Sequence, residues 1–395
     1  MLVSAPPRSR GSVALDKLRA SASLAVFFGH ARAIFFADPS QFRSIGPLGL
    51  ALNLSTRFAH VAVIVFFVVS GYLVGGSTAR SWQNGKFSAG DYAFTRLTRL
   101  WLVMIPALTI GLVLDAFGAS QFGWHPIYQG GGSWSSIILR PVDSALGWRT
   151  YLGNLAFLQT ILVHPQGSNG PLWSMANEFW YYVLLPLGLL ALSRRDRIHH
   201  RLFGLAGIAA ACAFVGLPVL TRFPIWLCGL GAAHLPYRSI QNASFWRWGI
   251  GICLVSFGLG STFLHRLDYW PVQIGTDYIL AAMAAGLIWL LMLDREADTD
   301  SKLSRASRAL SGMSFSLYLL HTPMLVLLAA ALIPEGERWV PTPARIGLWL
   351  MLCCGIIFVA WGHSRLFEFP IKAVRERLRS SPFLGARISP RPIDS

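Results

Sequence analysis

Ten apolar stretches, most of them close to 20 residues long, dominate this chain of 395 residues. Roughly 20 mostly apolar residues are needed for a helix to cross ~30 Å of hydrocarbon. Only 13% of the residues are charged, against about a quarter in soluble domains. We therefore expect an all-α fold, a polytopic integral membrane bundle of about ten transmembrane helices. The expected spans are residues 18–37, 58–76, 97–118, 172–192, 202–219, 223–237, 246–264, 275–293, 311–334 and 344–364.

Basic residues between these stretches are distributed unevenly. If both termini face the cytoplasm, the inside segments, counted through Arg247, carry 23 Lys and Arg residues, and the outside segments, counted through Arg345, carry 8. Cytoplasmic loops of membrane proteins are enriched in Lys and Arg, so the pattern predicts an N-in, C-in arrangement. It also explains the net charge of +16 without nucleic acid as a partner.

The spans divide the chain into three parts. We expect a cytoplasmic N-terminal tail (1–17), a membrane-embedded domain (18–364) and a basic cytoplasmic C-terminal tail (365–395). The long loop 119–171 is expected outside, and its apolar stretch 151–163 is short enough to favour an interfacial or re-entrant helix. No cleavable signal peptide is expected, and the five cysteines lack metal-ligand spacing, so no metal site is predicted.

Ionisable residues within the spans are few, and such residues by default mark function. Arg19 and His30 are 11 residues apart, which places them on one helix face about 16 Å apart. Glu178 lies at a depth similar to that of His30 from the outer side. It could accept the Nδ1 proton of His30 and support it as a general base. Alternatively, Glu178 neutralises Arg32 or pairs with neither residue. For His30 alone, the structural alternative is a hydrogen bond with another helix.

Two further sets of residues have both a functional and a structural interpretation. His321 lies about 15 Å into its span, and it is either part of the site or a buried structural histidine. Arg96 and Arg99 are one turn apart at the cytoplasmic end of the third span. They are either ordinary anchors at the membrane surface or a guanidinium pair that binds phosphates.

Several segments together resemble the acyltransferase 3 family of membrane-embedded O-acyltransferases. They occur in the family's order and cover most of residues 15–370, namely "LDKLRASASLAVFFGH", "VFFVVSGYLVGG", "RLTRLWLVMIP", "NGPLWSMANEFWYYVLLPL", "SFSLYLLHTP" and "FEFP". Two departures are Lys17, where many members have Gly, and "WSMANE" in place of "WSLxxE". These departures keep the proposed catalytic side chains but leave acceptor specificity open.

The resemblance implies transfer of an acyl group, commonly acetyl, from cytoplasmic acyl-CoA to a hydroxyl of an envelope carbohydrate or related acceptor. It implies His30 as the catalytic histidine, Arg19 as its paired arginine, and Arg96 with Arg99 as the arginine pair of the third span. The expected location is the inner (plasma) membrane.

The residues suggest how a thioester reaction would be arranged. The phosphates of acyl-CoA would remain at the arginines while its pantetheine arm passes Ser70 and Gly71 towards His30 and Glu178. An acyl-histidine intermediate remains an alternative to general-base catalysis. We assign the acceptor, its sugar rings and the reacting oxyanion to one further group: Trp173, Ser174, Asn177, Tyr318 and His321. For Trp173 the alternative is an aromatic belt at the membrane interface.

Two other classes of function are compatible with the same residues. In a proton-coupled transporter, the basic end would bind an anionic or lipid-linked solute while His30 and Glu178 relay protons. Against this, no repeated discontinuous helices of the kind common in secondary transporters are evident. A non-catalytic scaffold for envelope assembly would leave the intramembrane charges without a purpose.

Overall fold

The structure is a computed structural model that describes residues 9–38, 46–194, 196–236, 240–264, 269–294, 296, 301–334 and 336–380. The side chains of Thr262 and Phe263 are outside this description. Residues 1–8 of the expected N-terminal tail and 381–395 of the expected C-terminal tail also lie outside the described residues.

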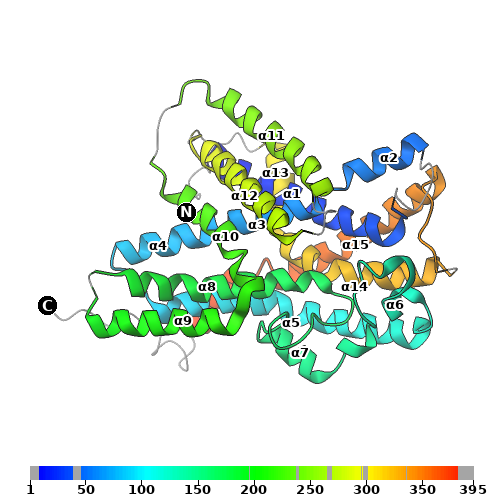
Figure 1. Ribbon diagram of the computed structural model, residues 1–395, viewed down its shortest axis with the longest axis horizontal. Helices are drawn as coiled ribbons and strands as arrows, with labels where there is room; N and C mark the ends of the chain where they lie inside the picture. Colours follow the sequence, from blue (N-terminus) through cyan, green and yellow to red (C-terminus); the bar gives the residue numbers. More distant parts are fainter. Residues whose placement is uncertain are drawn as a thin grey trace, which may run out of the picture.

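The described residues confirm an all-α fold, with two isolated β-bridges and no named strand among them. The helices pack in an elongated bundle, in which α8 lies beside α9 and α5 beside α14, while α1 contacts both α3 and α14 (Figure 1). Their bounds are α1 Arg10–Phe35, α2 Gly46–Ser55, α3 Ala59–Ser70, η2 Gly71–Gly75, α4 Gly76–Gln83, α5 Ala89–Phe122, α6 Pro126–Gln129, η3 Gly132–Trp134, η4 Asp143–Ala145, α7 Trp148–Leu155, η5 Gly170–Leu172, α8 Trp173–Leu192, α9 Ile198–Leu220, α10 Phe223–His234, α11 Ala243–Leu264, α12 Trp270–Met292, α13 Lys302–Gly312, α14 Ser314–Leu332, α15 Pro343–Phe367 and α16 Ile371–Ser380.

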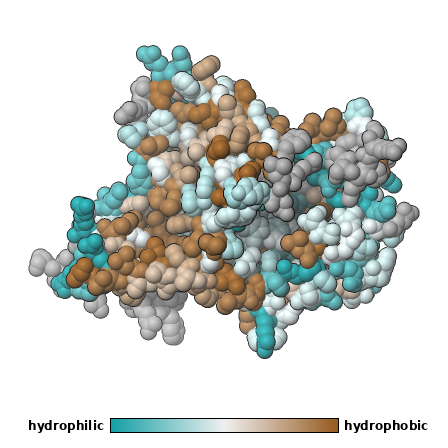
Figure 2. Space-filling model, in the orientation of Figure 1, coloured by the Kyte–Doolittle hydropathy of each residue, from teal (hydrophilic) through white to brown (hydrophobic). Residues whose placement is uncertain are grey.

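Within the described residues, seven helical stretches are long and apolar enough to cross a membrane. They are Gly46–Gln83, Ala89–Phe122, Gly170–Leu192, Ile198–Leu220, Trp270–Met292, Ser314–Leu332 and Pro343–Ser380. The expected number of ten is therefore not confirmed, although each of the ten expected spans overlaps a helix. Helix α10 has only 12 residues, and Arg19, His30 and Arg32 lower the hydropathy of α1. Figure 2 shows apolar residues over α8 and α9, with hydrophilic residues towards both ends of the view.

The second expected span begins a nearly continuous helix that changes its hydrogen bonding midway. Residues Gly71–Gly75 form a π-helical segment between α3 and α4. There α10 packs closely against the chain, because a methyl group on Gly229 would stand 1.9 Å from the Val68 carbonyl oxygen. A methyl on Gly71 would likewise stand 1.9 Å from the carbonyl oxygen of Trp226. The two glycines therefore let two helix backbones touch, as small residues do at membrane helix interfaces.

The long loop between α5 and α8 departs from one expectation. We expected one helix over 151–163, but α7 ends at Leu155. Phe157 and Thr160 have positive φ values of 57° and 69°, which a helix does not permit, so residues 156–165 form turns. The loop is attached to α5, because the buried Asp115 carboxylate accepts hydrogen bonds from the amide and hydroxyl of Ser168, each at 2.8 Å.

Candidate functional site

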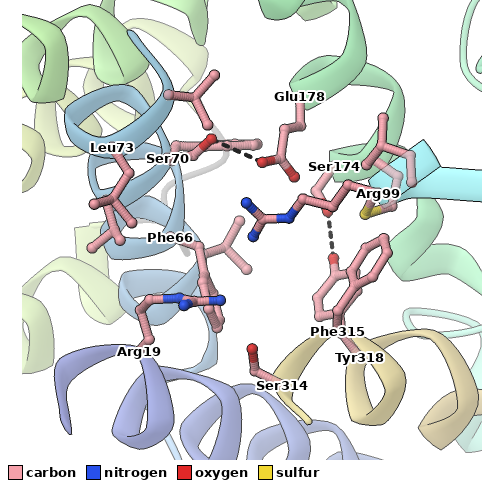
Figure 3. Close-up of a pocket in the computed structure, with 16 residues that line it drawn as sticks. Arg19, Phe66, Ser70, Leu73, Arg99, Ser174, Glu178, Ser314, Phe315 and Tyr318 are labelled. Atoms are coloured by element: carbon pink, nitrogen blue, oxygen red, sulfur yellow. Dashed lines mark hydrogen bonds between the residues drawn. The ribbon is translucent and has the colours of Figure 1, made fainter. Parts of the chain in front are cut away.

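A cavity of about 100 Å³ lies among α1, α3, η2, α5, α8 and α14. Figure 3 shows side chains from these separate helices pointing into it, with Arg19 and Arg99 among them. It is lined by Arg19, Val63, Phe66, Phe67, Val69, Ser70, Leu73, Val74, Arg99, Leu100, Ser174, Met175, Glu178, Ser314, Phe315 and Tyr318. Six residues expected from the sequence to act at a site are brought together here, namely Arg19, Ser70, Arg99, Ser174, Glu178 and Tyr318.

Positive charge in this cavity is incompletely neutralised. Arg19 is repelled by Arg99 and attracted by Asp16, Glu368 and Glu178. Within the described part of the chain, neither Arg19 nor Arg99 forms an ion pair within 4.0 Å. Two guanidinium groups that face one cavity without direct carboxylate partners are suited to binding an anion such as a phosphate.

Glu178 is held by hydroxyl groups. Its Oε1 accepts a hydrogen bond from Ser70 at 2.8 Å and another from Tyr182. Both pairings expected for this carboxylate, with His30 and with Arg32, are therefore wrong. The similar depth of His30 and Glu178 did not bring them together, because depth along the membrane says nothing of the rotation of each helix about its axis.

Arg96 and Arg99 have different surroundings although they are one turn apart. Arg99 lines the cavity, whereas the Arg96 guanidinium lies 5.4 Å from the ring centroid of Tyr92 and 5.8 Å from that of Tyr182. Arg96 thus makes cation–π contacts beside the cavity, and the expectation that the two arginines act as one clamp is not met by this arrangement.

Three other expected site residues lie outside the cavity lining. Gly71 faces the backbone of α10, so the expected open passage beside it is wrong. Trp173 packs against the ring of Phe67 at 5.9 Å between centroids and lies under the Arg222 guanidinium at 5.0 Å. Asn177 is buried, and its Nδ2 has no hydrogen-bond acceptor among the described residues.

Ser174 and Tyr318 close one side of the cavity. Their hydroxyl groups are 2.6 Å apart (Figure 3), and the Tyr318 hydroxyl donates to the Pro171 carbonyl at 2.7 Å. The ring of Tyr318 also lies 5.9 Å from the ring of His321 between centroids. Tyr318 therefore stands between the basic cavity and the histidine.

His30 and His321 form a pair. Nδ1 of His30 is 2.8 Å from Nε2 of His321, and the ring planes are 9° apart. His321 is fully buried, while His30 keeps part of its surface accessible. Neither histidine lines the cavity itself. His321 thus contacts the expected catalytic histidine, a relation that no spacing in the sequence reveals, since the two residues are 291 positions apart.

Arg32, the residue expected to compete for Glu178, belongs to a separate cluster at the end of α1. Its Nη1 is 2.8 Å from Asp38 Oδ1. The other Asp38 oxygen is 3.1 Å from Arg338 Nη1, which also donates to the Ala33 carbonyl at 3.0 Å. This cluster ties the loop before α15 to the C-terminal end of α1.

The Asp38 cluster predicts a pH-dependent contribution to stability. Burial raises the pKa of the Asp38 carboxyl, but Arg32 and Arg338 outweigh this, so the pKa lies below its ordinary value. The pairing therefore stabilises the fold above the ordinary carboxyl pKa of about 3.9 and is lost as the pH falls through the lower folded-state pKa. We expect Asp38→Asn to lower the free energy of unfolding at pH 7 by about 1 kcal/mol or less, since its side chain is 37% exposed.

This expectation is checked by thermal unfolding of both proteins in detergent between pH 7 and pH 3. The difference between them should narrow as the pH falls. A difference that stays constant over this range would show that the Asp38 charge is not the cause.

Glu368 makes a contact that the sequence did not predict, although Glu368 belongs to the segment "FEFP" and its partner Ser316 to "SFSLYLLHTP". Glu368 accepts hydrogen bonds from the Ser316 amide at 3.1 Å and the Ser316 hydroxyl at 2.8 Å. The Ser316 hydroxyl is also 3.0 Å from Nδ1 of His363. The carboxylate thereby binds the first turn of α14, the helix that carries Tyr318 and His321. The sequence does contain one signal for this contact, namely a carboxylate directly after an apolar helix. Such a carboxylate needs a partner, either a helix N-terminus or a hydroxyl group.

Most of the chain matches a known protein family. Residues 12–365 match the family described as "Acyltransferase domain" and named Acyl_transf_3. The chain belongs to the acyltransferase 3 family. All the site residues expected from the sequence lie within the matched region.

Two relatives give more detail. The acyltransferase MdmB of Streptomyces mycarofaciens is 27% identical over 286 residues, which cover 70% of this chain and 64% of that protein. The O-acetyl transferase of Shigella phage Sf6 is 26% identical over 242 residues, covering 56% of this chain and 61% of that protein. The matched regions thus cover less than two thirds of each relative's length. No solved structure matches this member of the acyltransferase 3 family.

Proposed function

We propose that this protein is a membrane O-acyltransferase that moves an acyl group, acetyl in the simplest case, from cytoplasmic acyl-CoA to a hydroxyl of an extracytoplasmic carbohydrate. The observation that carries the proposal is the cavity in which Arg19 and Arg99 face each other without ion-pair partners among the described residues. Membership of the acyltransferase 3 family supports an acyl donor, and the O-acetyl transferase of phage Sf6 supports acetyl.

The donor enters from the basic side of the membrane in this proposal. The phosphates of acyl-CoA bind Arg19 and Arg99, and the pantetheine arm passes along the apolar lining from Phe66, Leu73 and Phe315 towards His30. A cavity of about 100 Å³ is too small for the whole donor, because pockets for ligands of drug size have ~300 Å³ or more. The nucleotide therefore stays outside the cavity, towards the cytoplasm.

The acceptor is approached through His30. Its imidazole removes the proton of the acceptor hydroxyl while the hydroxyl oxygen attacks the thioester carbonyl carbon. The carbon–sulfur bond then breaks, and the proton returns from the imidazole to the leaving thiolate. Ser174 and Tyr318 stand between the cavity and the histidine pair. To stabilise the oxygen of the tetrahedral intermediate, the Tyr318 hydroxyl releases the Pro171 carbonyl and donates to that oxygen instead.

Glu178 has a different role from the one that the sequence suggested. Its hydrogen bonds with Ser70 and Tyr182 keep a carboxylate at the rim of the arginine site. There it attracts Arg19. We assign to it the positioning of the arginine side chains for the donor phosphates.

The bilayer arrangement follows from the same proposal. Ten crossings with both termini in the cytoplasm, in the inner membrane, place Arg19 and Arg99 towards acyl-CoA and the 119–171 loop towards the acceptor. The tails 1–17 and 365–395 are then cytoplasmic, and the domain between them is catalytic. This arrangement agrees with the polar residues near α6 and α7 in Figure 2.

The proposal is tested by thiol release from acetyl-CoA with the full chain in nanodiscs and a crude envelope glycan extract as acceptor. We expect release that requires the extract and yields an acetylated glycan in mass spectrometry. A folded protein that releases no thiol with acetyl-CoA or with longer acyl-CoAs would contradict it. Transport of an anionic solute by the same protein in liposomes would then be the alternative.

The arginine site makes a sharper prediction in the same assay. Arg99→Gln removes a cavity guanidinium and is expected to raise the KM for acetyl-CoA at least about tenfold, since charge-assisted hydrogen bonds contribute roughly 1.5–3 kcal/mol. Arg96→Gln, one turn away on the Tyr92 and Tyr182 rings, should change this KM by a smaller factor. Equal effects of the two substitutions would contradict the assignment of Arg99 to the donor.

A further inference from the structure

The hydrogen bonds around His321 determine where its proton is. Nδ1 of His321 is 2.8 Å from the Tyr318 carbonyl oxygen and 3.0 Å from the Leu317 carbonyl oxygen. Carbonyl oxygens only accept hydrogen bonds, so Nδ1 must be the donor and carry the hydrogen. A neutral imidazole has one N–H group, which leaves Nε2 of His321 with a lone pair.

The state of His321 in turn determines that of His30. Nε2 of His321 lies 2.8 Å from Nδ1 of His30, and two lone pairs would repel each other at this distance. Nδ1 of His30 must therefore carry a hydrogen and donate it. The other nitrogen of His30, Nε2, is then unprotonated. The Thr322 hydroxyl, 3.2 Å from Nε2 of His321, can only add a second donor to the same lone pair.

The geometry of the two rings fits a directed hydrogen bond. The ring centroids are 5.1 Å apart and the planes are 9° apart. Because the two nitrogens are 2.8 Å apart, a centroid separation of 5.1 Å is close to the largest that the two rings can have. The rings therefore lie edge to edge in nearly one plane. The hydrogen on Nδ1 of His30 then points along the lone pair of His321.

We propose that His321 is a positioning residue that holds His30 in its Nδ1–H tautomer, so that Nε2 of His30 is the base that receives the acceptor proton. This inference rests on the proposed function for its chemical consequence. It replaces the carboxylate expected from the sequence by a second imidazole, itself held by two backbone carbonyl groups of α14.

The arrangement also stabilises the charged intermediate of the reaction. When Nε2 of His30 takes the acceptor proton, the ring becomes a cation with hydrogens on both nitrogens. Its Nδ1–H group remains bonded to the lone pair of His321, and the Nδ1–H group of His321 remains bonded to the carbonyls of Leu317 and Tyr318. The positive charge is thus spread along a chain of hydrogen bonds that ends on carbonyl dipoles. No carboxylate needs to be buried beside the base.

The tautomer can be measured without any turnover. The ¹⁵N chemical shifts of histidine-labelled protein in nanodiscs distinguish Nδ1–H from Nε2–H imidazoles, and loss of one signal in His30→Gln identifies His30. We expect the Nδ1–H form of His30 in the wild-type protein. We expect His321→Leu, which removes the acceptor, to abolish the preference for that form. A His30 that is Nε2–H in the wild type, or unaffected by His321→Leu, would overturn the proposal.

Kinetics provide the second measurement. His321→Leu should lower kcat by roughly 100-fold or more, the range in which a correctly protonated general base contributes, with little change in the KM for acetyl-CoA. His321→Gln keeps an oxygen that can accept the His30 hydrogen and should recover part of kcat. His363→Leu removes another buried histidine, hydrogen-bonded to Ser316 on the first turn of α14, and serves as the matched control that should leave the His30 tautomer unchanged.

The outcomes separate this proposal from the proposed function. If wild-type protein releases no thiol, the acyltransferase proposal fails, while the ¹⁵N measurement still decides the tautomer. If thiol is released and His321→Leu and His321→Gln lower kcat equally without altering the His30 tautomer, His321 is only structural and the positioning role is refuted.

Discussion

His30→Ala is expected to abolish acceptor-dependent thiol release while leaving the protein folded and inserted in the membrane. The substitution removes the only group we assign to proton removal from the acceptor, and general-base catalysis contributes about 10²- to 10⁴-fold in rate. His30 also keeps part of its surface accessible, in contrast to the buried His321. The loss should therefore appear in kcat, with the KM for acetyl-CoA nearly unchanged, because the donor arginines are on the other side of Tyr318.

Two further variants, His30→Gln and His200→Ala, test whether the loss of thiol release is specific to the imidazole of His30. The Gln side chain keeps an N–H group that can donate to His321, so this variant should retain the packing of α1 against α14 and yet lose transfer. His200 is exposed at the start of α9, and His200→Ala should keep wild-type rates. Wild-type rates in His30→Ala would remove the general base from the mechanism. Proton-coupled solute uptake that is lost in His30→Ala, without any thiol release in the wild type, would favour the transporter.

The second large effect concerns stability. Gly229→Ala should lower the free energy of unfolding by at least about 2–3 kcal/mol, since overpacking typically costs 1–3 kcal/mol even where side chains can move. At Gly229 the atoms that the added methyl group would meet belong to the backbone of the neighbouring helix. The added methyl would stand 1.9 Å from the Val68 carbonyl oxygen and 2.7 Å from the Tyr72 amide nitrogen. The π-helical segment and α10 would have to separate, which would also displace Ser70 and the cavity beside it.

A matched control lies two residues along the same helix. Gly231 has no atom within 4 Å of the position that a methyl would take, and it is exposed. Gly231→Ala should therefore leave stability unchanged or raise it by up to ~1 kcal/mol through helix propensity. Thermal unfolding of both variants in detergent checks the pair. Similar unfolding temperatures for Gly229→Ala and the wild type would contradict the close contact between the two helices.

The helical nature of the chain could be predicted from the sequence because it depends on local properties. Apolar stretches near 20 residues long have to satisfy their backbone hydrogen bonds internally within a bilayer, and all ten expected spans overlap helices. Some local features nevertheless could not be predicted from the sequence. The apolar letters of 151–163 suggested a helix, but the positive φ values at Phe157 and Thr160 interrupt it, and apolar composition carries no information about such turns.

The candidate site was predicted in part. Arg19, Ser70, Arg99, Ser174, Glu178 and Tyr318 do lie around one cavity. Charge within apolar spans, depth along the helices and the family resemblance singled out these residues, and the packing of six elements then placed them together. Gly71 was assigned, together with Ser70, to the passage of the pantetheine arm. Ser70 faces Glu178, whereas Gly71 faces α10, because adjacent residues on a helix point about 100° apart.

Partnerships between side chains show most clearly what the sequence alone could not settle. The rise of 1.5 Å per residue fixes the depth of a side chain in the membrane, and by depth Glu178 was a suitable partner for His30. The rotation of each helix and its choice of neighbours depend on packing over the whole bundle. That packing places Glu178 against Ser70 and Tyr182, Arg32 against Asp38, and His30 against His321. The sequence by itself determined that ionisable groups lie within apolar helices and therefore need partners, whereas only the tertiary structure decided which partners they have.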